Sequence, residues 1–305
     1  MALNQVVEQT FGFLNIYKPT GMTSHDVVAV IRRVTKVKQV GHTGTLDPFA
    51  QGVLPVCIGK ATRLIEYLDD EKEYLAGISF GKSTDTYDLD GVTISECDSK
   101  LSEQDVVEGL KQFEGEILQT PPIYSALKVN GKKLYEYARN GEEVKIEARK
   151  VMIEKIELKN FDDESQIAEV LIKCSKGTYI RSIAHDLGQN LGVGAHLSKL
   201  IRTQAGKFFV GNSIPLEDIK TIEDVKNSLI NPLEILGLPQ ITINEDGNKK
   251  VMMGQPLQLA TVCNQKQETK EKIKNDDLII LIYNNKINAI AQACGNQIRV
   301  KKVFI

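Results

Sequence analysis

The sequence predicts an α+β fold, in which a large first domain with a mixed sheet precedes a small β-rich domain. Helix-like and strand-like patterns alternate irregularly over the first 230 residues, so a doubly wound parallel sheet is not expected. The segment NPLEILGLPQ at 231–240 contains two prolines and a glycine, which predict a break between domains. Short apolar runs typical of strands follow that break.

Local patterns predict the elements of the first domain in order. A helix begins where Thr23 or Ser24 can cap it. Its apolar side carries Val27, Val28, Ile31 and Val34. After it we expect a strand at Leu75 to Phe80, an amphipathic helix at Glu103 to Phe113, a strand at Ala168 to Cys174 and a helix at Tyr179 to Leu191.

Residues 240–305 are expected to form the β-rich domain. The strand-like runs LIILIY (278–283) and INAIAQA (287–293) are separated by Asn284 and Asn285, which predicts a hairpin. Residues 231–305 carry 10 basic and 7 acidic residues, whereas the first 230 residues carry 28 basic and 33 acidic ones.

The composition is that of an ordinary globular protein. The 305 residues are 42% hydrophobic and 26% charged, with a net charge of −2, which excludes a disordered chain, a collagen and a coiled coil. No apolar run approaches the roughly 20 residues that span a bilayer, and MALNQVVEQT lacks the features of a secretory signal. We therefore expect a cytoplasmic protein without membrane association.

The cysteines do not predict a metal site or a disulfide framework. They are odd in number and widely separated: Cys57, Cys97, Cys174, Cys263 and Cys294. Reduced thiols are the simplest interpretation.

A basic segment runs from Pro121 to Lys155. Its cations are Lys128, Lys132, Lys133, Arg139, Lys145, Arg149, Lys150 and Lys155. Such a segment suits a flap that grips a polyanion. From charge alone, a solvated surface hairpin or helix is the more common explanation.

The densest motif is GHTGTLDPFAQGVLP at 41–55. Its glycines permit a close approach of the backbone to a ligand, and Pro48 holds Asp47 away from helical geometry. A carboxylate on a stiff loop is a good nucleophile or base. The alternative is a turn in which Asp47 caps its own backbone.

Two other motifs are incomplete. GKAT at 59–62 lacks the earlier glycine and the Ser/Thr of a phosphate-binding loop. DTYDLDG at 85–91, aligned on Gly91, places Thr86 and Cys97 where a calcium loop needs acidic residues. We therefore expect no bound nucleotide and no structural metal.

Four further residues carry weaker signals. Arg181 in CSKGTYIR (174–181) can pair with a buried carboxylate or hold a phosphate, although a surface arginine on a first helical turn is more common. An isolated tyrosine such as Tyr74 is more often a core residue than a catalytic one. His185 and His196 are interpreted as structural.

Several sequence blocks together resemble the bacterial tRNA pseudouridine-55 synthases. The blocks occur in the family's order: NIYKPTGMTSHDVV (15–28), GHTGTLDP (41–48), GKATRLIEYL (59–68), KEYLAGISFGKSTDTYDLDG (72–91), TPPIYSALKVNGKKLYEYAR (120–139), CSKGTYIRSIAHDLG (174–188) and GAHLSKLIRT (194–203). The resemblance covers nearly all of the first 230 residues.

The resemblance implies the pseudouridine synthase fold: a long, mostly antiparallel sheet with a central cleft, plus a small C-terminal β-barrel-like domain. It also implies isomerisation of the T-loop uridine (position 55) of tRNA. No cofactor takes part, and the uridine must be flipped out of its stack to expose the glycosidic bond. Asp47 matches the catalytic aspartate, which acts at the sugar or at the base ring.

The resemblance assigns the other site residues position by position. Arg181 matches the arginine that pairs with the aspartate, and Tyr74 the tyrosine that stacks on the target base. The expected substrate-binding residues are His42 beside the flipped nucleotide, Tyr179 and Leu200 lining the uridine pocket, Lys18 in the KP motif that packs on the catalytic loop, and Arg202 as a phosphate contact. Gln51 and Ile201 depart from the family pattern, which commonly has Thr and Arg there.

The predicted domains are a catalytic domain at 1–235, with the flap at 121–155, and an RNA-binding domain of PUA type at 240–305. The expected partner is tRNA, through its T stem-loop and possibly its acceptor region. We expect a monomer without an obligate protein partner.

Three alternatives stay open at this point. A guided synthase acting on ribosomal RNA would share GHTGTLDP but lack the flap. An RNA-binding protein that helps tRNA fold would keep its binding role after substitution of Asp47. A glycosidase that releases free base would need two working carboxylates.

Overall fold

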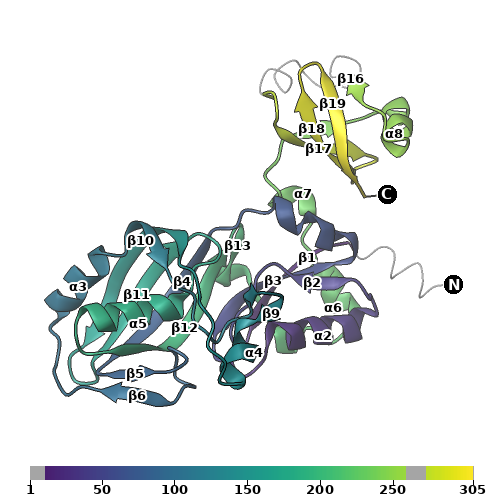
Figure 1. The fold of residues 1–305 in the computed structure, drawn as a ribbon. Coiled ribbons are helices and arrows are strands. Elements are labelled where there is room, and N and C mark those ends of the chain that lie inside the picture. The colour runs from purple at the N-terminus through teal and green to yellow at the C-terminus, as the bar shows by residue number, and fades with distance from the viewer. Residues whose placement is uncertain (1–10, 259–272, 305) are drawn as a thin grey trace. The chain divides into compact units, whose positions relative to one another are not determined.

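The computed structural model describes residues 11–258 and 273–304, and it contains two compact units (Figure 1). The first unit ends at Ile230, and Asn231 opens the second. Residues 232–235 form the short helix α7 (Pro232–Ile235), capped by Asn231, with proline in its first turn. The first compact unit thus ends at Ile230, and the predicted catalytic domain at 1–235 extends into this short helix.

The first unit is built around a mixed sheet of ten strands. Eight of them lie side by side in the order β14 (Ile214–Pro215), β1 (Gly12–Lys18), β3 (Gln51–Ile58), β12 (Ala195–Ala205), β4 (Lys72–Phe80), β11 (Ile167–Cys174), β10 (Arg149–Asp162) and β7 (Gly115–Gln119). In addition, β2 (Val40–His42) pairs with β3, and β13 (Phe208–Phe209) pairs with β12. Only the pairs β1–β14 and β3–β12 are parallel. The predicted mixed, mostly antiparallel sheet is confirmed.

Helices cover this sheet, and their ends follow the capping signals. In α2 (Ser24–Thr35), Thr23 is the N-cap and forms a capping box with Asp26. The other helices are α3 (Glu103–Lys111), α5 (Ile180–Asn190) and α6 (Ile222–Asn227), and the short 3₁₀ helices are η1 (Gly59–Tyr67), η2 (Val210–Asn212) and η3 (Leu216–Asp218). A Cβ on Gly188 would lie 2.1 Å from the backbone nitrogen of Ala195, so this glycine lets α5 pack closely on β12.

The predicted flap is shorter than the basic segment. Residues 128–139 form β8 (Lys128–Val129), β9 (Lys132–Lys133) and α4 (Leu134–Arg139). Residues 149–155, however, belong to β10, which pairs with β7 and β11 in the main sheet. There, exposed Lys150, Met152 and Glu154 alternate with buried Val151 and Ile153, which is the pattern of a strand with one face toward solvent. The flap therefore ends at 148.

The second unit contains a five-stranded sheet. Its order is β15 (Gln240–Thr242), β17 (Leu278–Tyr283), β18 (Lys286–Cys294), β19 (Gln297–Val303) and β16 (Leu257–Gln258), and α8 (Glu245–Met252) accompanies it. The predicted hairpin is confirmed: Asn284 and Asn285 both adopt positive φ, 50° and 58°, between β17 and β18.

The incomplete motifs have structural roles. Gly59 of GKAT adopts a φ of 64° and begins η1 directly after β3. DTYDLDG connects β5 (Lys82–Thr84) with β6 (Thr93–Glu96). No helix within residues 11–258 and 273–304 is long and apolar enough to cross a bilayer. The first ten residues and Cys263, on which parts of the sequence interpretation rest, lie outside the described residues.

Candidate active site

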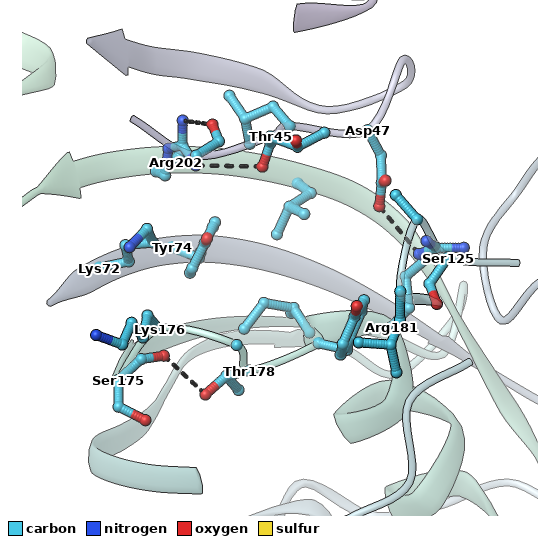
Figure 2. A pocket seen from close by; sticks show the side chains of 18 of the residues that line it. Thr45, Asp47, Lys72, Tyr74, Ser125, Ser175, Lys176, Thr178, Arg181 and Arg202 are labelled. Atoms are coloured by element: carbon cyan, nitrogen blue, oxygen red, sulfur yellow. Dashed lines mark hydrogen bonds and ion pairs between the residues drawn. The ribbon is translucent and has the colours of Figure 1, made fainter. Parts of the chain in front are cut away.

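A cavity of about 430 Å³ lies over the middle strands of the main sheet. Its walls come from the loop 43–47, the strands β4 and β12, the start of the flap at 125–127 and the segment 175–181 that leads into α5. Figure 2 shows Asp47 and Arg181 at one end and Lys72 and Lys176 toward the other. Six predicted residues meet in this cavity: Asp47, Tyr74, Tyr179, Arg181, Leu200 and Arg202.

The loop that carries Asp47 is fixed by two buried cations. The Lys18 ammonium donates to the backbone oxygens of Pro19, Met22 and Pro48, at 2.9, 2.6 and 3.3 Å. The Arg202 guanidinium donates to the oxygens of Val53 and Gly44, at 2.7 and 3.1 Å. Each cation thus ties the loop to the sheet.

Lys18 is fully buried and does not line the cavity, so the structure places it in the loop's support rather than at the substrate. Burial lowers the pKa of Lys18 to about 8. Arg202 is 1% exposed, and its donors are directed to the backbone oxygens of Val53 on β3 and of Gly44 in the loop. Its surroundings make it a support of the loop as well.

Close packing around Arg202 explains why the motif at 41–55 has a glycine at position 52. Gly52 adopts a φ of 105°, and a Cβ there would lie 2.3 Å from the backbone oxygen of Arg202. The parallel strands β3 and β12 therefore approach each other at a point where a side chain would not fit. Next to it, Gln51 and Ile201 are register partners, and neither of these departures from the family pattern lines the cavity.

Arg181 joins Asp47 to a second carboxylate. Its Nε lies 3.0 Å from Oδ2 of Asp47, and one terminal nitrogen lies 3.0 Å from Oδ2 of Asp88. The same guanidinium also donates to the backbone oxygens of Thr86 and Tyr124, each at 3.0 Å. Because Arg181 is 6% exposed and held on four sides, its position is set before substrate arrives.

The two carboxylates have different surroundings. Asp88 is 5% exposed, and its Oδ1 accepts from the Thr86 hydroxyl and the Asp90 amide. The Asp47 side chain keeps 34% of its surface exposed in the cavity. Its contact with Arg181 is an ion pair without the alignment of a hydrogen bond, since the buried Nε has no hydrogen-bond partner. Asp47 is therefore the carboxylate that can reach a substrate.

Burial raises the pKa of Asp47, and Asp88 adds to the increase, whereas Arg181 and Lys18 oppose it. The direction follows from loss of hydration, which disfavours the charged form. Asp47 thus carries its charge at an energetic cost, and this cost makes the carboxylate more reactive than one in water.

We expect the raised pKa of Asp47 to appear in the pH profile of the reaction. The ionised form acts, so kcat/KM falls with decreasing pH through the folded-state pKa, above the 3.8 of an ordinary aspartate. Asp186 is the matched control, because burial raises its pKa to about 6 and it does not line the cavity. Asp186→Asn should leave the acid limb in place; a limb that moves with this variant would contradict the assignment.

The aromatic and apolar residues form the walls of the cavity. Tyr74 on β4 is 7% exposed, and burial raises the pKa of its phenol, so it is neutral at neutral pH. Leu200 on β12 is 6% exposed. Tyr179 is the N-cap residue of α5, and its backbone is held by the Gln119 amide through two hydrogen bonds of 2.8 and 3.0 Å.

His42 stands apart from these residues. It ends β2, one residue before Thr43, and is not among the residues that line the cavity. Its ring meets that of His25 edge to face, with centroids 5.4 Å apart. Burial lowers the pKa of His42 to about 4, so it is neutral at neutral pH.

The sequence interpretation missed Asp88 and Lys72. Asp88 lies in DTYDLDG, where the clustered aspartates and glycine signal a tightly hydrogen-bonded turn. Its actual partner is Arg181, 93 residues further along the chain. Lys72 lines the cavity two residues before Tyr74, so alternation along β4 could have placed both on one face.

Comparisons with known proteins identify the family of this chain. Residues 32–180 match the model of the TruB family pseudouridylate synthase N-terminal domain, and residues 181–236 match that of the tRNA pseudouridylate synthase B C-terminal domain. A tRNA pseudouridine synthase B of Symbiobacterium thermophilum is 47% identical over 257 residues, covering 83% of this chain and 85% of the relative. The protein of that name from Clostridium tetani is 39% identical over 297 residues, covering 96% and 99%.

Solved structures give the same relationship at lower identity. The crystal structure of a Cbf5-Nop10-Gar1 complex matches with a TM-score of 0.68 and 27% identity, over 99% of this chain and 87% of the other. An H/ACA RNP bound to a substrate RNA containing 2′-deoxyuridine matches with a TM-score of 0.68 and 25% identity, over 100% and 87%. With family models and relatives covering most of its length, this chain belongs to the TruB family of pseudouridylate synthases, enzymes that isomerise uridine to pseudouridine.

Proposed function

We propose that this chain converts the T-loop uridine at position 55 of tRNA into pseudouridine, with Asp47 as the essential carboxylate. One observation carries the proposal: among the described residues that line the cavity, Asp47 is the single carboxylate, and it is paired with the buried Arg181. The choice of tRNA is supported by relatives with 39–47% identity that bear the name tRNA pseudouridine synthase B.

The reaction exchanges one bond of ribose C1′ for another. The bond from C1′ to N1 of uracil breaks, and the electron pair stays on the base. The detached ring turns, C5 bonds to C1′, C5 loses its proton and N1 gains one, so atoms and charge balance without a co-reactant. An ionised Asp47 stabilises the electron-poor C1′ by attack or by charge. If it adds to the base ring instead, it is released when C5 bonds to the sugar.

The surrounding residues favour return of the base over its loss. Leu200 and Tyr74 line the cavity and keep water from the reacting carbon. The neutral Tyr74 phenol offers a face for stacking on uracil and a hydroxyl for proton transfer. A glycosidase would need a second working carboxylate, but Asp88 is directed to Arg181, Thr86 and Asp90.

The test is conversion of an unmodified tRNA transcript by the purified chain alone, with pseudouridine mapped to the nucleotide. We expect one product at position 55, and no product in a matched transcript with cytidine there. Modification elsewhere would overturn the site assignment. Activity that appears only after a guide RNA and protein partners are added would favour the alternative of a guided enzyme.

The flap is proposed to hold the RNA stem-loop over the cavity. Its first residues, Ser125, Ala126 and Leu127, line the cavity. Backbone hydrogen bonds from Leu134 to Leu127 and from Tyr135 to Ser125 fold the flap back onto that wall. Lys128 and Arg139 are exposed, whereas Lys132 is paired with Glu142 at 2.7 Å.

We therefore expect Lys128 and Arg139 to supply the salt-dependent part of binding. In Lys128→Gln/Arg139→Gln, the slope of log affinity against log salt should decrease by about 2, because each phosphate contact contributes roughly 1. The matched control is Lys100→Gln/Lys111→Gln, which removes two exposed cations from the first unit outside the flap and the cavity. An unchanged slope in the flap variant would remove the flap from the electrostatic contact.

The second unit is proposed as a PUA-type domain that contacts the acceptor region of tRNA. Its net positive charge suits that role. A self-sufficient monomer is part of the same proposal, because the flap and the complete catalytic set occur in one chain. Deletion of residues 231–305 should then weaken binding of whole tRNA more than binding of an isolated T stem-loop.

A further inference from the structure

The end of the cavity away from Asp47 is lined by cations and hydroxyl groups that the reaction at C1′ does not use. Lys72, Lys176, Ser175 and Thr178 all line this cavity (Figure 2). Lys72 opens β4, and the other three lie in the turn between β11 and α5.

Lys72 is a half-buried ammonium whose charge is poorly compensated. Its Nζ donates to the backbone oxygen of Asp70 at 2.8 Å. The Asp70 carboxylate is engaged by Lys176, and within the described residues no carboxylate forms an ion pair with Lys72. Burial lowers the pKa of Lys72, and the nearby cations Arg202 and Lys176 lower it further.

Arg202, the cation next to Lys72, donates to backbone carbonyls and not into the cavity. A Cβ at Gly44 would lie 3.4 Å from Cε of Lys72 and 3.7 Å from a terminal nitrogen of Arg202, so both side chains flank the catalytic loop at that point. Arg202 donates to the backbone oxygens of Val53 and Gly44, as described above. Lys72 keeps ammonium donors for a ligand, because an ammonium has three and one is used by Asp70.

Ser175 adds a neutral donor beside it. Its Oγ accepts from the Met152 amide at 3.0 Å, which leaves the hydroxyl hydrogen available. Thr178 closes the turn by donating to the backbone oxygen of Ser175 at 2.9 Å. Gly177 adopts a φ of 82°, and a Cβ there would meet nothing within 4 Å, so the turn leaves open space.

We propose that this end of the cavity is a phosphate subsite, in which Lys72 binds the backbone phosphate next to the flipped uridine, assisted by Ser175. The proposal rests on the proposed RNA substrate and names the part of it that Lys72 takes. Uracil and ribose are neutral, so the phosphodiester is the group in that substrate that compensates a half-buried ammonium. When C1′ of the ribose lies at Asp47, the two phosphates attached to that ribose lie nearby, because they are bonded to the same sugar.

The test pairs one protein change with one RNA change. Lys72→Met removes the charge and keeps an unbranched side chain, and a single methylphosphonate neutralises either phosphate beside the target uridine in a T stem-loop. With wild type, we expect one of the two methylphosphonates to raise KM about tenfold, as for a lost charge-assisted hydrogen bond, with little change in kcat. Lys72→Met should show the same rise with unmodified RNA and no further rise with that methylphosphonate.

Two controls keep the result interpretable. Lys100→Met removes an exposed lysine outside the cavity, and its response to the methylphosphonates should equal that of wild type. Lys72→Arg should retain most of the affinity, because it keeps the charge. If Lys72→Met does not fold, the methylphosphonate scan with wild type and Lys72→Arg still tests the subsite.

Two outcomes overturn the inference while the proposed function stands. In the first, Lys72→Met and each methylphosphonate raise KM independently, so that their effects add. In the second, neither the protein change nor the RNA change affects KM. Absence of pseudouridine with wild type and unmodified RNA would instead overturn the proposed function.

Discussion

Asp47→Asn is expected to abolish pseudouridine formation while it raises the stability of the fold. The amide cannot attack C1′ or carry the charge that stabilises it, so the rate should fall on the order of 10⁴-fold or more. The pKa of Asp47 is raised by burial, so its ionised form opposes folding above that folded-state pKa. Removing the charge should therefore raise Tm at neutral pH, by roughly 2–4 °C for each kcal/mol recovered.

The pH dependence of that gain gives an internal control. Because the native protein holds the Asp47 proton more tightly than the unfolded chain, the stability gain should shrink as pH falls from the folded-state pKa toward 3.8. Binding of tRNA should survive the substitution. Retained turnover would remove Asp47 from the chemistry, and retained binding without any wild-type turnover would favour a protein that only binds RNA.

Arg181→Met is expected to affect both activity and stability. Asp88 is only 5% exposed, and the substitution leaves its buried carboxylate without the cation that pairs with it. Breaking a buried ion pair from one side costs about 3–5 kcal/mol, which corresponds to a fall in Tm on the order of 10 °C. Activity should be lost because Asp47 is no longer held. Arg181→Lys keeps the charge but cannot reproduce the fork that contacts Asp47, Asp88 and two carbonyls, so it should fold with lower stability and a severely reduced rate.

The double variant Arg181→Met/Asp88→Asn separates the two roles of the arginine. With both buried charges gone, the variant should be more stable than Arg181→Met alone, but equally inactive. Thermal unfolding and single-turnover assays of the four proteins in this cycle measure the coupling. Equal stability of the single and double variants would show that Asp88 does not depend on Arg181.

Much of the local structure could be predicted from neighbouring residues. Thr23 caps α2 through hydrogen bonds with Asp26, only three residues further along the chain. Asn284 and Asn285 form the β17–β18 turn because both tolerate positive φ. The basic segment was the exception: the alternation of Val151 and Ile153 marks a strand, and the charge pattern concealed it.

The sequence by itself singled out Asp47 as the candidate carboxylate, because it lies between a glycine-rich run and Pro48 on a loop of restricted geometry. It also determined the α+β class and the break before the second domain, because these depend on periodicity and turn residues. The tertiary structure alone decided that Arg181 joins Asp47 to Asp88, that Lys18 and Arg202 are buried supports of the loop, and that Lys72 lines the far end of the cavity. The physical reason is distance along the chain: these long cationic side chains can reach many partners, and only the packing of β3, β4, β12 and α5 fixes which acceptors remain within reach.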